Sequence, residues 1–226
     1  MKNNFINLSV LALLTLGVLA CSDDDNQSPE SKNATLLMKS SAVNLKTAYE
    51  ITFAEATIHV EEVEFESLEI DGDDFDVDFE GPFAIDLLTG ISQPKIPTAY
   101  LLPGKYEEVE VELDDDVSPN IQVAGSQYID DENSIDFVFM ADEDIDFEAE
   151  AEAEDVGQAY LFEVIEGENI NIVMEFKLNE WFKSVEFSSG IANEDGIVVV
   201  SKTENEQLYQ QIIRNIEQSK LLVYAD

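Results

Sequence analysis

Residues 58–65 read IHVEEVEF, and the order of apolar and polar side chains in this stretch indicates a β-strand. Apolar and polar residues alternate up to Val60, as expected for a strand with one buried face and one face in water. The alternation resumes at Val63, but one residue out of phase. An extra residue in one strand of a pair produces such a phase change, so we predict a β-bulge near Glu61 and Glu62.

The same alternation recurs along the rest of the chain, and turn residues separate the runs. Many short strands with turns between them predict a mostly β protein, namely an antiparallel β-sandwich of the immunoglobulin or transthyretin type. The apolar residues of these further runs are Phe75, Val77, Phe79, Phe83, Ile85, Leu87, Tyr106, Val109, Val111, Leu113, Ile135, Phe137, Phe139, Ile145, Phe147, Tyr160, Phe162, Val164, Ile170, Ile172, Met174, Phe176, Leu178, Ile197 and Val199.

One segment near the C-terminus has the spacing of a helix. Apolar residues recur every fourth position from Leu208 to Ile216, and Thr203 and Glu206 have the spacing of a capping box. We therefore predict one C-terminal amphipathic helix over about residues 204–218, packed on a sheet.

The first residues have the pattern of a secretory signal. Lys2 precedes an apolar run from Phe5 to Ala20, which is too short for a comfortable transmembrane helix. The run ends in Val18-Leu19-Ala20-Cys21, which resembles the lipobox of bacterial lipoproteins. The resemblance implies cleavage before Cys21 and acylation of that cysteine, so residues 1–20 are expected to be a lipoprotein signal peptide. An ordinary signal peptide followed by a chance cysteine is the alternative.

Residues 21–33 are polar and acidic, and their composition predicts a flexible tether before a β-sandwich domain over residues 34–226. Ser22, Asp23, Asp24 and Asp25 resemble the acidic export signal of Bacteroidota lipoproteins. The resemblance implies a lipid-anchored protein of the outer membrane that is exposed at the cell surface. The periplasmic face of the same membrane, with a merely solvated spacer, is the alternative.

Charge limits the classes of partner. The chain has 11 Lys and Arg against 50 Asp and Glu, a formal net charge of −39, although 45% of its residues are apolar and can form a core. Such a charge argues against nucleic-acid binding, which requires cations that neutralise phosphates, and against adsorption to anionic lipid. The expected partners are the membrane, which the lipid on Cys21 would contact, and a protein or a glycan. Cys21 is the only cysteine, so we expect no disulfide and no thiolate metal site.

Clustered carboxylates make calcium the cofactor to consider, although none is required, because this cation takes six to eight oxygen ligands. None of the clusters fits an EF-hand loop, and a solvated acidic surface is the alternative for each of them. The candidate ligands are Asp71, Asp73, Asp74, Asp76 and Asp78, then Asp114, Asp115 and Asp116, and finally Asp130, Asp131 and Glu132.

Residues 148–154 alternate glutamate with alanine, which predicts a charged edge strand that resists pairing with other sheets. A cation-binding or partner-binding surface is the second interpretation, and the high helix propensity of both residue types leaves a helix open.

No residue pattern is specific for catalysis, so we expect no enzyme. His59 is the only histidine, and it cannot supply a zinc site without cysteine partners. A glycan hydrolase that uses a pair of carboxylates is the remaining enzymatic alternative. Its sugar site would be lined by aromatic residues, for which core packing is the commoner role: Phe137, Phe139, Trp181 and Phe182.

Three segments resemble a known family. Residues 56–64 (ATIHVEEVE), 83–90 (FAIDLLTG) and 102–106 (LPGKY) are similar to the family called domain of unknown function 4382. The resemblance covers roughly Ala34 to Leu113 and implies a bacterial lipoprotein or secreted protein with a β-sandwich-like domain and no known catalytic residue. We therefore expect a lipid-anchored, non-catalytic binding or structural module at the cell surface, with a calcium-dependent binding module and a glycan hydrolase as alternatives.

Overall fold

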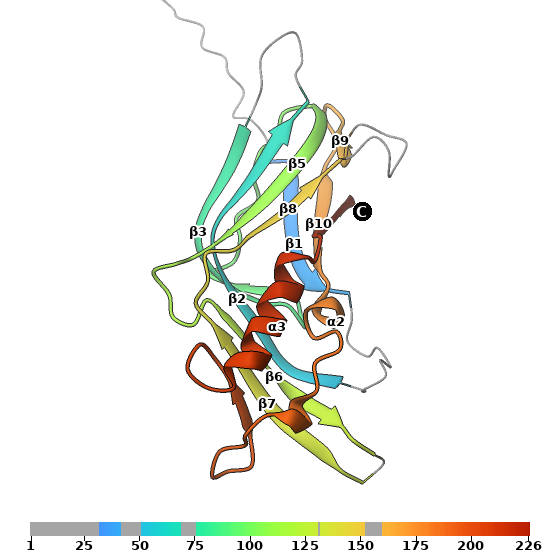
Figure 1. The fold of residues 1–226 in the computed structure, drawn as a ribbon. Helices are drawn as coiled ribbons and strands as arrows, with labels where there is room; N and C mark the ends of the chain where they lie inside the picture. The colour runs from blue at the N-terminus through green and yellow to red at the C-terminus, as the bar shows by residue number, and fades with distance from the viewer. Residues whose placement is uncertain (1–31, 42–50, 69–75, 131, 152–159) are drawn as a thin grey trace, which may run out of the picture. The chain divides into compact units, whose positions relative to one another are not determined.

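The computed structural model describes residues 32–41, 51–68, 76–130, 132–151 and 160–226 (Figure 1). Strands dominate these residues, which confirms the prediction of a mostly β protein. None of the helices in the described ranges has the length and apolar content needed to cross a bilayer.

The described residues contain twelve strands and three short helical elements. The strands are β1 (Ala34–Ser40), β2 (Ile51–Ser67), β3 (Asp76–Asp86), β4 (Ile91–Gln93), β5 (Gly104–Leu113), β6 (Ile121–Tyr128), β7 (Ser134–Ala141), β8 (Asp146–Glu150), β9 (Phe162–Val164), β10 (Ile170–Phe176), β11 (Val198–Val200) and β12 (Leu222–Ala225). The helices are α2 (Leu178–Trp181), the 3₁₀ turn η1 (Phe187–Ser189) and α3 (Glu206–Glu217).

The strands form two sheets. The larger sheet has the order β11-β7-β6-β2-β3-β4, and β5 joins it by pairing with β2, β8 and β9. The long strand β2 organises this sheet, because β6 pairs with its first half and β5 with its second half. The smaller sheet has the order β1-β10-β12.

Both sheets are mixed, so the prediction of an antiparallel sandwich is confirmed only as a mostly β fold. β1 runs parallel to β10, and β11 runs parallel to β7. The alternation of side chains is the same in parallel and antiparallel strands, and long crossovers connect these pairs. The direction of pairing was therefore invisible in the sequence pattern.

The predicted bulge in β2 is confirmed. The register of β2 with β3 and with β5 shifts between Val60 and Glu62. Gly81 of β3 lies against this bulge, where a Cβ atom would stand 2.4 Å from the carbonyl oxygen of Val60 and 2.7 Å from that of Glu61. Only glycine leaves room for the two carbonyl groups, so Gly81 permits the conformation that places Glu61.

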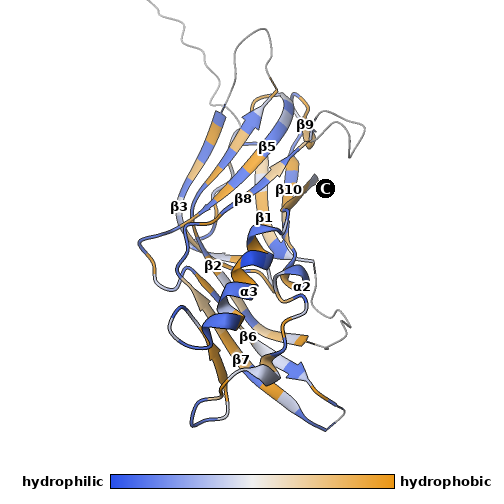
Figure 2. Cartoon of the chain, viewed as in Figure 1, coloured by the Kyte–Doolittle hydropathy of each residue, from blue (hydrophilic) through white to orange (hydrophobic). Residues whose placement is uncertain are grey.

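The apolar faces of both sheets meet in one core. Phe147 of β8 and Phe176 of β10 connect the two sheets, with ring centroids 5.0 Å apart. Figure 2 shows the alternation of hydrophobic and hydrophilic residues along β3, β5 and β8, as expected for strands with one face in this core.

The predicted C-terminal helix is confirmed as α3, which buries Leu208, Ile212 and Ile216. The predicted capping box is wrong, because Asn205 precedes the helix in a left-handed conformation with φ 52°. The side chain of Asn205 instead donates a hydrogen bond to the carbonyl of Val199 at 2.7 Å. The strand predicted up to Leu178 stops at Phe176, and Leu178 begins the short helix α2.

Candidate functional site

The most distinctive surface is one face of the sheet formed by β3, β2, β5 and β8. Each of these strands alternates carboxylates with buried apolar residues, and the registers align the carboxylates into rows. We call this surface the acidic face. Its rows are Asp76–Glu66–Glu108–Glu150, Asp78–Glu64–Glu110–Glu148 and Glu80–Glu62–Glu112–Asp146.

The other side of the same strands belongs to the core. The row Phe79–Val63–Val111–Phe147 lies there, and all four side chains are buried. Successive side chains of a strand point to opposite faces of the sheet. When the apolar residues pack in the core, the carboxylates between them therefore face the solvent. The acidic face is therefore fixed in register by the packing beneath it.

Every cross-strand neighbour within the acidic face has the same charge. Like charges directly opposite each other in a sheet are destabilising. The ion pairs of Lys183 with Glu180 at 3.0 Å and of Lys202 with Glu143 at 3.3 Å both lie elsewhere. The face therefore carries a strong negative field that a cationic ligand would relieve.

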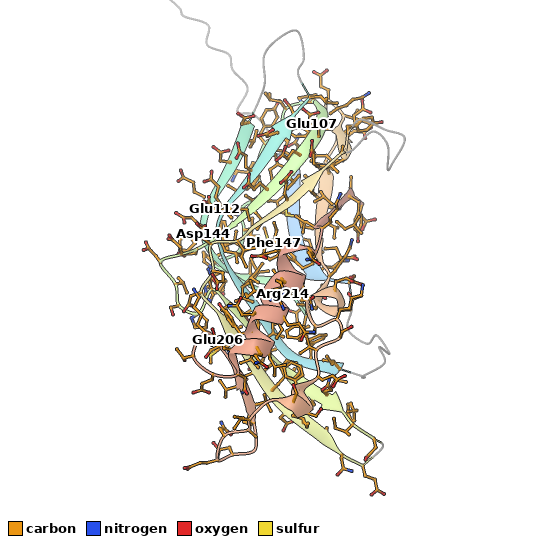
Figure 3. All side chains as sticks on the ribbon, viewed as in Figure 1. Glu107, Glu112, Asp144, Phe147, Glu206 and Arg214 are labelled. Carbon is orange, nitrogen blue, oxygen red and sulfur yellow. The ribbon has the colours of Figure 1, made fainter. Side chains whose placement is uncertain are left out.

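Partial burial and, after it, the repulsion between neighbours raise the pKa of several of these carboxyl groups. Partial burial followed by the charges of Glu66, Glu148 and Glu150 raises the pKa of Glu108 to about 7. Burial and neighbouring carboxylates likewise raise the pKa values of Glu64, Glu110, Glu112 and Asp146. Figure 3 shows Glu112 beside Asp144, whose charge contributes to this effect.

A second cluster lies at the end of β5. Glu61, Asp114 and Asp115 each place one carboxylate oxygen within 4.8 Å of the others. Asp114 is 7% exposed, and its Oδ1 accepts a hydrogen bond from the backbone N–H of Asp116 at 3.0 Å. The bulge in β2 turns Glu61 towards these two aspartates, whereas the sequence alone had marked Glu61 only as part of the bulge.

This cluster has the donor type that a hard cation prefers, but it supplies only part of a coordination shell. One oxygen from each of the three carboxylates gives three ligands, whereas calcium takes six to eight. Burial and the charges of Glu112 and Asp114 raise the pKa of Glu61. A bound divalent cation would lower this pKa again, because it favours the charged form.

Among the residues that the structure describes, no other predicted ligand joins this cluster. Asp130 forms its own turn, in which its Oδ1 accepts hydrogen bonds from the backbone N–H groups of Glu132 and Asn133, each at 2.9 Å. The side-chain amide of Asn133 donates to both carboxylate oxygens of Asp130 at 2.8 and 2.9 Å, and these bonds, followed by the backbone ones, lower the pKa of Asp130. Asp76 and Asp78 belong to the acidic face. The predicted residues that lie outside the described ranges are Cys21, Ser22, Asp23, Asp24, Asp25, Asp71, Asp73, Asp74 and Asp131.

The aromatic residues considered for a sugar site have a structural role. Phe137, Phe139, Trp181 and Phe182 are at most 3% exposed and pack in the core. Phe139 contacts Phe182 edge to face with ring centroids 5.9 Å apart. Core packing, which was the commoner interpretation of these residues, is therefore correct.

Comparison of the chain with protein-family models, with curated proteins and with solved structures finds no match. The resemblance to the family called domain of unknown function 4382 stays a prediction.

Proposed function

We propose that this chain is a lipid-anchored, non-catalytic module of β-sandwich architecture that binds cationic ligands at the surface of the outer membrane. The acidic face carries this proposal, because four neighbouring strands align three carboxylates each with no cation between them. Maintaining such a surface costs stability, and binding of a cationic partner recovers part of that cost.

The N-terminal sequence supports the anchored part of the proposal. Cys21 follows a basic and apolar signal, and residues 22–25 continue as SDDD. Several acyl chains on one cysteine hold a protein durably at a bilayer, since each buried methylene contributes about 0.8 kcal/mol. A long acidic tether would present the domain away from the membrane surface.

Replacement of the anchoring cysteine tests the location. In the producing bacterium, Cys21→Ser is expected to move the protein from the membrane fraction to the soluble fraction, because no thiol remains to carry the lipid. The matched control is Ser22→Ala, which leaves the thiol in place and should stay with the membranes. Retention of the Cys21→Ser protein in washed membranes would contradict the anchor.

Neutralisation of one row tests the binding function. The full chain with Asp78→Asn, Glu64→Gln, Glu110→Gln and Glu148→Gln should bind a hexalysine peptide about tenfold more weakly than the parent at low salt. The measurement is isothermal titration calorimetry in a neutral detergent. The control changes four exposed carboxylates outside the face, by the substitutions Glu166→Gln, Glu168→Gln, Glu194→Gln and Glu204→Gln. If both variants bound hexalysine equally weakly, the weakening would come from the lower net charge and not from the acidic face.

Calcium binding is a second candidate, and the gathering of Glu61, Asp114 and Asp115 favours it. A calorimetric titration with calcium chloride distinguishes calcium binding at this cluster from ligand binding at the acidic face. A dedicated site loses its heat of binding in Asp115→Asn and keeps it in the row variant of the acidic face. A titration without heat in the parent protein would remove this candidate.

A further inference from the structure

A groove of about 650 Å³ lies between the two sheets where an edge strand of each is open. β8 lines one side of it, and residues 220–223, which include the start of β12, line the other. Among the described residues, β8 pairs only with β5 and β12 pairs only with β10. The groove is therefore bordered by two strand edges that no other described strand covers.

The backbone of β8 offers hydrogen-bonding groups to this groove. The N–H of Ala151 donates to the carbonyl of Glu107 at 2.8 Å, which places Ala151 in a hydrogen-bonded pair with β5. Antiparallel strands alternate between hydrogen-bonded and non-hydrogen-bonded pairs. The peptide groups of Glu148 and Glu150 therefore point away from β5 and towards the open edge, where an extended segment can add as a further strand.

The side chains around the groove specify what that segment carries. Ala149, Leu161, Ile216 and Leu221 give the groove apolar lining. Glu148 and Glu150 stand on the opposite face of β8 from Ala149, at the border of the acidic face. A strand added to β8 would thus place apolar side chains over the lining and its alternate side chains beside glutamates.

The charges select one kind of occupant. A second copy of β8 would set Glu148 and Glu150 against like charges, which disfavours self-association through this edge. Lysine or arginine at alternate positions would complete the rows of the acidic face with opposite charge. Lys177 and Lys220 also line the groove, outside β8. They repel cations, so we expect the lysine or arginine side chains of the occupant to face the glutamates of β8.

We propose that this groove binds an extended peptide segment in which lysine or arginine alternates with apolar residues, added as a strand to the open edge of β8. The inference rests on the proposed binding function and names its partner class. The five residues of β8 correspond to an extended length of about 17 Å, so a five-residue segment matches the strand.

Two peptides of equal charge test strand addition. The full chain in neutral detergent is titrated with acetyl-Lys-Val-Lys-Val-Lys-amide and with the analogue in which all five backbone nitrogens are methylated. The methylated analogue has no backbone N–H groups to donate to β8, so the unmethylated peptide is expected to bind at least about tenfold more tightly. It should also slow hydrogen exchange at the amides of Glu148 and Glu150, and shift the fluorescence of Trp181, which stacks on Phe147 of β8.

Charge reversal locates the binding edge. Glu148→Lys with Glu150→Lys should lose the lysine peptide and bind acetyl-Glu-Val-Glu-Val-Glu-amide instead, a gain that misfolding cannot produce. The matched control is Asp78→Lys with Glu80→Lys on β3, at the far side of the acidic face. This control should keep the exchange protection in β8.

Two results would overturn the inference in distinguishable ways. Equal binding of the unmethylated and methylated peptides, weakened as much by the control as by the β8 variant, would leave the acidic face as the binding surface and remove the groove. Absence of binding by both of these peptides and by hexalysine would remove the proposed function together with the groove.

Discussion

Gln127→Ala is expected to lower the free energy of unfolding by about 2–5 kcal/mol, since it leaves two buried backbone groups without partners. The side chain of Gln127 is fully buried. Its Nε2 donates to the carbonyl of Val185 at 2.7 Å, and its Oε1 accepts from the N–H of Phe187 at 2.9 Å. One amide thus holds the irregular segment before η1 against β6.

The packing around the side-chain amide of Gln127 explains why its removal also weakens neighbouring contacts. The ring of Phe187 stacks on Phe137 of β7 with centroids 3.9 Å apart. Without Gln127, the segment that carries Phe187 loses its polar attachment, and the cavity left by the side chain weakens the same contact. A decrease of roughly 5–15 °C in Tm is expected for a chain of this size.

Urea denaturation followed by circular dichroism measures this effect. Gln122→Ala is the matched control, because Gln122 is on the same strand and half-exposed, with one weak contact of 3.4 Å to Glu55. It should change the free energy of unfolding by less than about 1 kcal/mol. Equal destabilisation by the two substitutions would show that the buried amide has no special role.

The protein is expected to melt at a higher temperature at pH 5 than at pH 8, by several degrees. Carboxyl groups of the acidic face have raised pKa values in the folded state, led by Glu108 at about 7. A raised pKa means that the folded state binds protons more tightly than the unfolded chain. The stability gained from the proton is complete below the unfolded pKa of about 4.5 and is lost as pH rises through about 7.

Asp130 acts in the opposite direction, but outside this range. Its pKa is lowered from 3.8, so its contribution is lost only as pH falls below that value. Differential scanning calorimetry at constant ionic strength between pH 5 and pH 8 therefore reports mainly the acidic face. Glu108→Gln should flatten the profile and raise Tm at pH 8, and Glu194→Gln should leave both unchanged. A Tm that falls from pH 8 to pH 5 would contradict the assignment.

Much of the fold could be predicted from local patterns. The phase change between Val60 and Val63 located the bulge, and the fourfold spacing from Leu208 to Ile216 located α3. Both signals arise from residues close in the sequence, whose side chains face the same environment. The parallel pairing of β1 with β10 joins residues far apart, and no local pattern records it.

The candidate site could be predicted only in its parts. Alternating acids were visible in β2, β3, β5 and β8 separately, but their alignment into rows depends on strand order and register. Asp114 and Asp115 were predicted as ligands, whereas Glu61 joins them through the bulge. The groove beside β8 depends on the placement of the second sheet, and no local pattern of residues indicates that placement.

The pairing of β1 with β10 also bears on how the chain reaches this structure during synthesis. Ala34 meets Ile170, so the first strand to emerge has to wait for more than a hundred further residues before its partner exists. Contacts between such distant segments slow folding. Leu36 and Met38 are buried in the folded protein, but their strand partner is missing until β10 emerges, so we expect the nascent chain to expose apolar surface that a chaperone can bind.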